Sequence, residues 1–427
     1  MKTVKQKIPY GKRSIEFSLP RSGFLGRVEH PAARGPDIGK LLSAAFAGPL
    51  GKVTLESAVR GKRKVLIVVT DATRKACVKE ILPRLLRTID DGARTITIIV
   101  ATGLHKTHDK KELKDLLGEA VVARYGVRSH GLGNGDIVKL GVTKRGVPIT
   151  LDGNLFEHDV VLSIGTVEPH LYAGYSGGAK TIAIGLAGRE TIDATHGVRF
   201  LDDRMTRIGS IGRNPFQETL WEIASHVPLR FSVNVVNDHA GRAIKIFCGE
   251  TRAVFRAGVD FARKLYEVTV RKSADIVLCG IGYPKDINLY QASRAINYVL
   301  NVDRPVLKRG GVLIVAAELK DGAGTSPAEF MFYDMLRKME CPRRFLATVK
   351  KEGCVAGAHR AYMVAGPLVN YEIIFVTGRD KKFMEGLPLR YATTIREALD
   401  RAEKITGKQP TIYVIPHALA TIARVGG

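Results

Sequence analysis

KVLIVV (Lys64–Val69) followed by TDATR (Thr70–Arg74) sets a pattern that the rest of the chain repeats. A short, continuous run of aliphatic and β-branched residues predicts a strand that is buried on both faces. The polar segment after it predicts a turn, and the apolar residues at helical spacing between positions 78 and 85 predict a helix. A strand, a turn and a helix in this order form the repeating unit of a parallel sheet covered by helices.

The same unit recurs along the chain of 427 residues and starts again after residue 273. Further strands are predicted at Thr95–Ala101, Val160–Ile164, Ala274–Cys279, Gly311–Ala316, Ile373–Val376 and Thr411–Ile415, with helical patterns between them. A basic helical stretch around residues 263–273 separates the two sets. The sequence therefore predicts an α/β fold with two domains, residues 1–268 and 269–427. Each would be a mostly parallel sheet covered by helices, with the active site in the cleft between them.

The composition, 45% hydrophobic and 25% charged, is typical of a soluble globular protein. No apolar run approaches the length of about 18–20 residues that a membrane span needs. The charged first residues lack the apolar centre of a secretory signal. Five widely spaced cysteines without a CxxC pair favour a reducing cytosol over a disulfide framework. We therefore expect a cytoplasmic protein that does not associate with membranes.

The net charge of +24, from 66 basic and 42 acidic residues, predicts attraction to anions. The lysines and arginines are spread along the chain, and the sequence contains neither a zinc finger nor an aromatic-rich RNA-recognition element. A small anionic substrate is therefore favoured, and nucleic acid is not expected as a partner.

Reactive side chains follow three of the predicted strands. Asp71 and Arg74 come after the first strand, His105 after the second and His170 shortly after the third. Ligands of open parallel sheets bind beyond the carboxyl ends of the strands, where these side chains would meet. One Arg at a strand end is often a cap or an ion-pair partner, but three such ends at one sheet edge indicate a functional site. His108 is interpreted as a residue at the start of the following helix.

The densest motif is EPHLYAGYSGGAKT (Glu168–Thr181). It approaches the P-loop pattern G-x-x-x-x-G-K-[ST], but Ala179 occupies the last glycine position. A glycine-rich turn before a helix still exposes backbone N–H groups to an anion, although Gly177-Gly178 can also be a tight strand-to-helix turn. Downstream, His196 precedes a glycine and is either a helix C-cap or a metal ligand. With no HExxH motif and no paired His nearby, the other ligands of such a metal would have to come from a cofactor.

Together these motifs resemble the nickel-dependent lactate racemases, a family of 2-hydroxy acid racemases and epimerases with a nickel-pincer nucleotide cofactor. The resemblance covers nearly the whole chain, and its long central motif is specific. The matching motifs are Glu168-Pro169-His170 through Ser176-Gly177-Gly178-x-Lys180, His196, Asp71-x-Thr73-Arg74, Ala101–His105 and Leu289–Ala292.

The resemblance implies a cofactor, nickel held by pyridinium-3,5-bisthiocarboxylic acid mononucleotide, that is covalently bound to Lys180 through a thioamide. His196 would be the protein ligand to nickel, and His105 and His170 would be the catalytic acid–base pair. Cofactor contacts are implied for Asp71, Ala72, Thr73, Arg74, Ser176, Gly177 and Gly178, and substrate contacts for Arg74, Tyr290, Gln291, Arg294 and His359. The N-terminal domain would hold the cofactor, and the C-terminal domain would close over the substrate. Cofactor-building enzymes would be partners for maturation.

The implied chemistry is physically coherent. The Cα proton of a 2-hydroxy acid is very weakly acidic, whereas loss of a hydride gives a planar 2-oxo acid that can take the hydride back on either face. A neutral His can accept the hydroxyl proton and return it, and an Arg can hold the carboxylate. The hydride acceptor must be a cofactor, because no side chain performs this chemistry.

Two positions depart from the lactate-specific pattern: Arg294 replaces a Lys, and His359 stands where the family has a Trp. With the basic charge, they favour a larger 2-hydroxy acid, such as a hydroxy-diacid or a sugar acid; alternatively, Arg294 merely replaces Lys as a carboxylate clamp. The motifs are also compatible with another hydride-transfer enzyme that uses the same cofactor, with a P-loop-like phosphate enzyme and with a non-catalytic nickel-cofactor-binding protein. The presence of both His105 and His170 argues against the non-catalytic protein, which needs no paired bases.

Overall fold

The computed structural model describes residues 2–30, 35–131, 137–353, 358–379 and 381–426, so Cys354 lies outside the described residues. The chain forms two compact units, and segments of the two alternate along the sequence. Unit 1 contains Met1–Pro31, His196–Gly209 and Tyr266–Gly427, and unit 2 contains Ala32–Thr195 and Ser210–Leu265. The chain passes from unit 2 to unit 1 for the last time between Leu265 and Tyr266, close to the predicted domain boundary between residues 268 and 269. The roles predicted for the two domains stay predictions.

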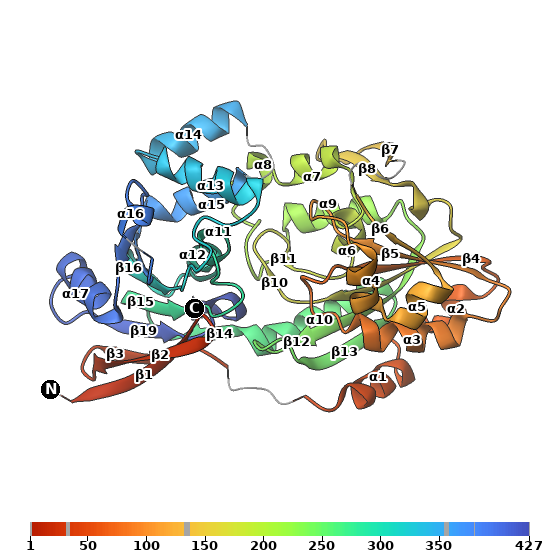
Figure 1. Ribbon diagram of the computed structural model, residues 1–427, viewed down its shortest axis with the longest axis horizontal. Coiled ribbons are helices and arrows are strands. Elements are labelled where there is room, and N and C mark those ends of the chain that lie inside the picture. Colours follow the sequence, from red (N-terminus) through yellow and green to blue (C-terminus); the bar gives the residue numbers. More distant parts are fainter. Residues whose placement is uncertain (1, 31–34, 132–136, 354–357, 380, 427) are drawn as a thin grey trace. The chain divides into compact units, whose positions relative to one another are not determined.

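Unit 2 is built on a six-stranded sheet in the order β13-β12-β9-β4-β5-β6, in which only the β12–β13 pair is antiparallel (Figure 1). The strands are β4 (Lys64–Thr70), β5 (Thr95–Ala101), β6 (Gly126–Ser129), β9 (Val160–Thr166), β12 (Leu229–Asn237) and β13 (Ala243–Gly249). The central residues of β4 are fully buried, as their continuous apolar run predicts. The predicted strands β4, β5 and β9 are confirmed, whereas β12 and β13 were not predicted.

Helices cover both faces of the unit 2 sheet. The bounds are α1 (Ile38–Ala47), α2 (Leu55–Val59), α3 (Val78–Ile89), α4 (Lys110–Leu117), α5 (Glu119–Arg124), α6 (Lys180–Ala183), α7 (Arg189–Thr195), α9 (Pro215–Ala224) and α10 (Thr251–Tyr266). Short strand pairs are β7 (Ile137–Val142) with β8 (Pro148–Asp152), and β10 (Pro169–His170) with β11 (Gly174–Tyr175); a 3-10 helix spans Gly153–Leu155.

The start of α4 determines where two histidines lie. Asp109 caps this helix by accepting a hydrogen bond from Glu112 N at 2.8 Å, and the Glu112 carboxylate accepts one from Asp109 N at 2.9 Å. This reciprocal capping box fixes Asp109 as the helix boundary. His105 and His108 therefore lie in the loop between β5 and α4.

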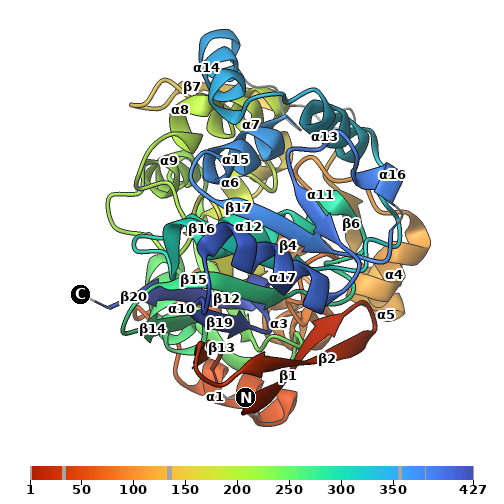
Figure 2. The same cartoon turned by 90° about the vertical axis from the view of Figure 1, so that its left-hand side faces the viewer.

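Unit 1 contains an all-parallel sheet in the order β18-β17-β16-β15-β19-β3, which confirms the predicted α/β class (Figure 2). Its strands are β3 (Phe24–Arg27), β15 (Ala274–Gly280), β16 (Leu307–Ala316), β17 (Glu372–Val376), β18 (Arg390–Ala392) and β19 (Ile412–Ile415). A second pair joins β14 (Glu267–Val270) to β20 (Ile422–Val425). The first residues form an antiparallel hairpin, β1 (Thr3–Tyr10) with β2 (Arg13–Pro20), that was not predicted.

The hairpin and α17 pack their buried side chains on one face of the unit 1 sheet, and α17 lies in front of it in Figure 2. The helices are α8 (Val198–Leu201), α11 (Leu289–Ala292), α12 (Arg294–Leu300), α13 (Pro327–Arg337), α14 (Pro342–Glu352), α15 (His359–Leu368), α16 (Lys381–Met384) and α17 (Ile395–Thr406), with a 3-10 helix at Ala418–Ala420. The helical segment after β15 consists of the two short helices α11 and α12, which meet at Ser293.

Asp275 ties the start of β15 to its neighbours in unit 1. Its carboxylate accepts hydrogen bonds from Thr411 N at 2.9 Å and Thr411 Oγ1 at 2.5 Å, and it pairs with Lys308 Nζ at 2.8 Å. Burial alone would raise the pKa of Asp275, but these contacts outweigh it and lower the pKa to about 2.

We expect Asp275→Asn to lower the free energy of unfolding by about 1–2 kcal/mol at pH 7. Because the folded-state pKa lies below the unfolded one, this stabilisation is present above the unfolded pKa and is lost as the pH falls toward 2. Urea denaturation at pH 7 and at pH 3 should show the difference between variant and wild type shrinking at the lower pH. Asp400→Asn, which removes a surface pair with Arg396, is the control and should change stability little.

Candidate active site

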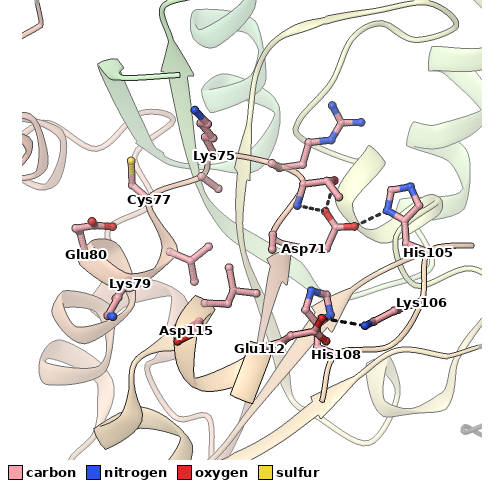
Figure 3. A pocket seen from close by; sticks show the side chains of 16 residues that line it. Asp71, Lys75, Cys77, Lys79, Glu80, His105, Lys106, His108, Glu112 and Asp115 are labelled. Carbon is pink, nitrogen blue, oxygen red and sulfur yellow. Dashed lines mark hydrogen bonds and ion pairs between the residues drawn. The ribbon is translucent and has the colours of Figure 1, made fainter. Parts of the chain in front are cut away.

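The structure brings the polar ends of three neighbouring strands together in unit 2. Strands β9, β4 and β5 are adjacent and parallel, so Glu168, Asp71 and His105 follow strands that end at the same sheet edge. An open pocket of about 630 Å³ lies beyond β4 and β5 (Figure 3). Its lining includes the turn from Asp71 to Arg74, together with His105 and His108.

Asp71 and His105 form a hydrogen-bonded pair at this edge. The Nδ1 atom of His105 lies 2.5 Å from one Asp71 carboxylate oxygen, and the other oxygen accepts from Thr73 Oγ1 at 2.5 Å and Thr73 N at 3.1 Å (Figure 3). Asp71 is buried, which alone would raise its pKa, but the contacts with His105 and Thr73 outweigh burial and lower the pKa. An ionised Asp71 accepts the Nδ1 proton and leaves Nε2 of the largely exposed His105 ring as a proton acceptor.

The hydrogen bond from His105 indicates that Asp71 orients this ring, and the expected contact of Asp71 with the cofactor stays a prediction. We therefore expect Asp71→Asn to reduce turnover about 10²-fold or more, because an amide does not hold the same His tautomer. If Lys180 carries the expected cofactor adduct, intact-mass spectrometry should show that the adduct persists in this variant. Thr73→Val, which removes a hydroxyl donor to the same carboxylate, should have a smaller effect on turnover. Loss of the adduct from Asp71→Asn would instead support a direct cofactor contact.

Arg74, the expected carboxylate clamp, forms an ion pair with Glu168. Both side chains are about a quarter exposed, at 26% and 28%. Glu168 belongs to the central motif, but sequence reasoning gave it no role of its own. The pairing shows what Glu168 does in this structure: it holds the Arg74 guanidinium at the edge where β4 and β9 end.

His170 has a different hydrogen-bond environment from His105. Its Nδ1 atom accepts from the backbone N–H groups of Tyr172 at 3.3 Å and Ala173 at 3.2 Å, and its ring packs against Tyr172 and Phe216. A backbone N–H can only donate, so the neutral ring carries its proton on Nε2. The neutral His170 therefore presents a donor, whereas the neutral His105 presents an acceptor.

The glycine-rich segment forms a tight turn between β11 and α6. Gly177 and Gly178 have φ angles of +92° and +54°, which L side chains rarely adopt. A Cβ on Gly177 would lie 2.8 Å from Asn234 Oδ1, so this glycine is also required by packing. Ser176 Oγ donates to Thr166 O at 2.8 Å and accepts from Glu168 N at 3.1 Å. These contacts shape the turn, and cofactor contacts by Ser176, Gly177 and Gly178 stay predictions.

Lys180 is the first residue of α6, directly after this turn. Burial, followed by the nearby charge of Arg74, lowers the pKa of Lys180 to about 7, against a smaller opposing effect of Asp71. A substantial fraction of the amine is therefore unprotonated and nucleophilic at neutral pH. This property fits a lysine that becomes covalently modified.

The other predicted site residues lie in unit 1. The rings of His196 and His359 contact each other, with centroids 5.6 Å apart. Gln291 Oε1 accepts from Arg294 Nη1 at 3.4 Å, and the Arg294 guanidinium lies over Tyr298. The roles predicted for these residues in metal and substrate binding stay predictions.

Sequence reasoning missed one charged residue beside this group, Arg360. Its guanidinium lies over the Tyr290 ring, 5.4 Å from the ring centroid. Its position directly after His359 was the available signal, but the sequence could not show that the side chain is buried.

Two family models match the chain over most of its length. The model described as "Lactate racemase N-terminal domain" matches residues 10–209, and "Lactate racemase C-terminal domain" matches residues 269–423. The chain belongs to the lactate racemase family. Membership in this family also confirms the expected enzyme class, an isomerase.

Relatives and solved structures agree with this assignment. The lactate racemase of Thermoanaerobacterium thermosaccharolyticum is 27% identical to this chain, and the alignment covers 98% of each protein. The lactate racemase of Lactiplantibacillus plantarum is 29% identical, and the alignment covers 98% of this chain and 99% of the relative. The lactate racemase apoprotein structure from Thermoanaerobacterium thermosaccharolyticum matches 99% of this chain and 100% of its own, with 26% identity and a TM-score of 0.89. A Thermotoga maritima protein at 17% identity, with a TM-score of 0.64, covers 87% of this chain and 98% of its own and shares the fold.

Within the described part of this lactate racemase family member, no helix is long and apolar enough to cross a membrane.

Proposed function

We propose that this chain racemises or epimerises a 2-hydroxy acid by reversible hydride transfer with a lysine-tethered nickel-pincer nucleotide. The observation that carries the proposal is the grouping in unit 2 of an oriented His base, an Arg and a lysine whose pKa is about 7. Lactate racemase is the activity named for the curated relatives. That activity needs an acid–base pair in addition to a modifiable lysine, whereas a cofactor carrier needs no acid–base pair.

The residues fit the proposed cofactor in two respects. The Lys180 amine is available as a nucleophile near pH 7, as a covalent tether requires. Arg74 and Asp71, whose charges act on Lys180, line an open pocket, and Lys75 and Lys79 in the same lining suit an anionic mononucleotide. When bound, the group would supply the hydride acceptor that side chains lack. His196 is proposed as the protein ligand to nickel, and cofactor-building enzymes are proposed as partners in maturation.

The chain's own residues would move the proton. His105, held by Asp71, accepts the substrate hydroxyl proton at Nε2. The neutral His170 can hydrogen-bond the oxygen of the 2-oxo acid through its Nε2–H, and to return a proton to that oxygen the ring must first be cationic. Protonating Nδ1 of His170 would place it against two backbone donors, so a cationic His170 requires the segment from His170 to Ala173 to shift. Arg74 would bind the carboxylate in exchange for part of its contact with Glu168.

The test uses protein produced together with the cofactor-building enzymes. Intact-mass spectrometry should show an adduct on Lys180, and chiral chromatography should show that a single enantiomer of a 2-hydroxy acid is converted to both. An adduct without any stereochemical conversion across a panel of 2-hydroxy acids would favour the carrier instead. Net oxidation of the acid would indicate another hydride-transfer enzyme.

A further inference from the structure

Arg360 is a buried cation with unused hydrogen-bonding capacity. Its side chain belongs to a residue that is only 7% exposed, and it lies in the first turn of α15. Among the residues that the structure describes, Nε and Nη1 of Arg360 find no hydrogen-bond partner. Arginine is seldom fully buried unless it is paired, because an unpartnered charge loses its hydration without compensation. The native fold therefore keeps this guanidinium at an energetic cost.

The surroundings of Arg360 add positive potential rather than compensate it. The residue lies at the amino end of α15, where the helix dipole is positive, and the N-cap residue Ala358 has no polar side chain. The neighbouring His359 contacts His196, a second imidazole. Its stacking partner Tyr290 is neutral and offers the face of its ring. An anion beside Arg360 would satisfy the free guanidinium donors and oppose the helix dipole.

The position of α15 places this anion site next to the residues predicted to bind substrate. Helix α15 leads into β17 and α11 follows β15, so the start of each helix lies toward the carboxyl edge of the unit 1 sheet. The contact between Arg360 and Tyr290 joins these two helix starts. Arg294 is in the next turn of the chain after Tyr290, which gives unit 1 a second guanidinium at this edge.

We propose that Arg360 binds a second anionic group of the substrate, so that the chain acts on 2-hydroxy acids with two acidic groups, such as 2-hydroxy diacids. The inference rests on the proposed function and names its substrate class. Another cation of the site is expected to engage one carboxylate, and Arg360 is then available for the other. A second carboxylate or a phosphate would satisfy the same donors, so both are included in the test.

The first experiment compares cofactor-loaded wild type, Arg360→Met and Arg360→Lys on single enantiomers of lactate, malate, 2-hydroxyglutarate, gluconate and a phosphorylated 2-hydroxy acid. Wild type should prefer a doubly anionic acid over lactate by about tenfold or more in kcat/KM. Arg360→Met should lower that preference at least about tenfold, and Arg360→Lys should retain part of it. The arm with the highest kcat/KM distinguishes a second carboxylate from a phosphate.

Arg401→Met is the matched control, because Arg401 also lies over a tyrosine ring in unit 1 but is paired with Glu397 and more exposed. It should leave the preference unchanged. Lactate or gluconate as the best substrate, or equal losses on lactate and diacids in Arg360→Met, would overturn the inference while leaving the racemase intact. No turnover of any acid by adduct-bearing wild type would instead contradict the proposed function.

A second readout needs neither cofactor nor turnover. In the cofactor-free protein, Arg360→Met should raise the Tm, because it removes an uncompensated buried cation while retaining apolar contact with Tyr290. Malate should raise the wild-type Tm more than lactate at equal concentration, and this difference should vanish in Arg360→Met. A lower Tm in Arg360→Met together with equal responses to malate and lactate would show a purely structural arginine.

Discussion

Lys180→Ala should abolish both the covalent cofactor adduct and all racemisation, the largest effect expected for any single substitution in this chain. The lysine is the proposed tether, and an alanine offers no nucleophile in its place. Lys180→Arg should fail as well, because a guanidinium keeps the charge but does not form the thioamide. Intact-mass spectrometry and a racemisation assay on the same preparations give the two readouts.

A pH series tests the same residue in another way. Burial and the charge of Arg74 hold the pKa of Lys180 at about 7, so the fraction of neutral amine rises as the pH increases from 6 to 8. Attachment of the cofactor should therefore accelerate over this range. Lys139→Ala, at an exposed lysine of the same unit, should load normally. A Lys180→Ala protein that still carries the adduct would place the tether at another residue.

The second large effect is expected at the acid–base pair. His105→Ala and His170→Ala should each reduce the rate about 10²–10⁴-fold, which is the usual contribution of a positioned acid–base group. Chiral chromatography starting from each enantiomer measures the rate in both directions, and both rates should fall. His108→Ala should be much milder, since the described contacts of its side chain include the Ser129 hydroxyl and not Asp71.

Glutamine variants separate the roles of the two histidines. His170→Gln keeps an N–H donor, so it should retain more activity than His170→Ala. His105→Gln offers no group basic enough to take the hydroxyl proton, so it should resemble His105→Ala. If His105→Gln is the more active of the two glutamine variants, the assignment of base and donor is reversed.

The element types were predictable because they depend on local pattern. Continuous apolar runs gave β4, β9 and β15 within a residue or two of their ends, since strands buried on both faces have little choice of residue. The N-terminal hairpin was missed because it alternates exposed and buried positions with many charges, as an edge element packed by one face does. The break at Ser293 between α11 and α12 depends on packing that a helical period does not reveal.

The candidate site was predictable in its members but not in its pairings. The motifs named Lys180, His105, His170 and Arg74, because phosphate-loop-like glycines, strand-end histidines and a basic residue are visible in the residue order. They did not show that Asp71 would orient His105 across 34 positions, or that Glu168 would hold Arg74 across 94. Those contacts exist only once β4, β5 and β9 lie side by side.

By itself, then, the sequence determined the α/β class, the motifs that place the chain in its family and the residue types available for chemistry, because each follows from periodicity or from short spacing along the chain. The tertiary structure alone decided which residues share a proton and which carboxylate neutralises which cation. It also decided that Arg360 is buried with two guanidinium nitrogens that have no hydrogen-bond partner among the described residues. These properties depend on burial and on distances between segments remote in sequence. Burial and distance set electrostatic energies, and neither is encoded in a local pattern.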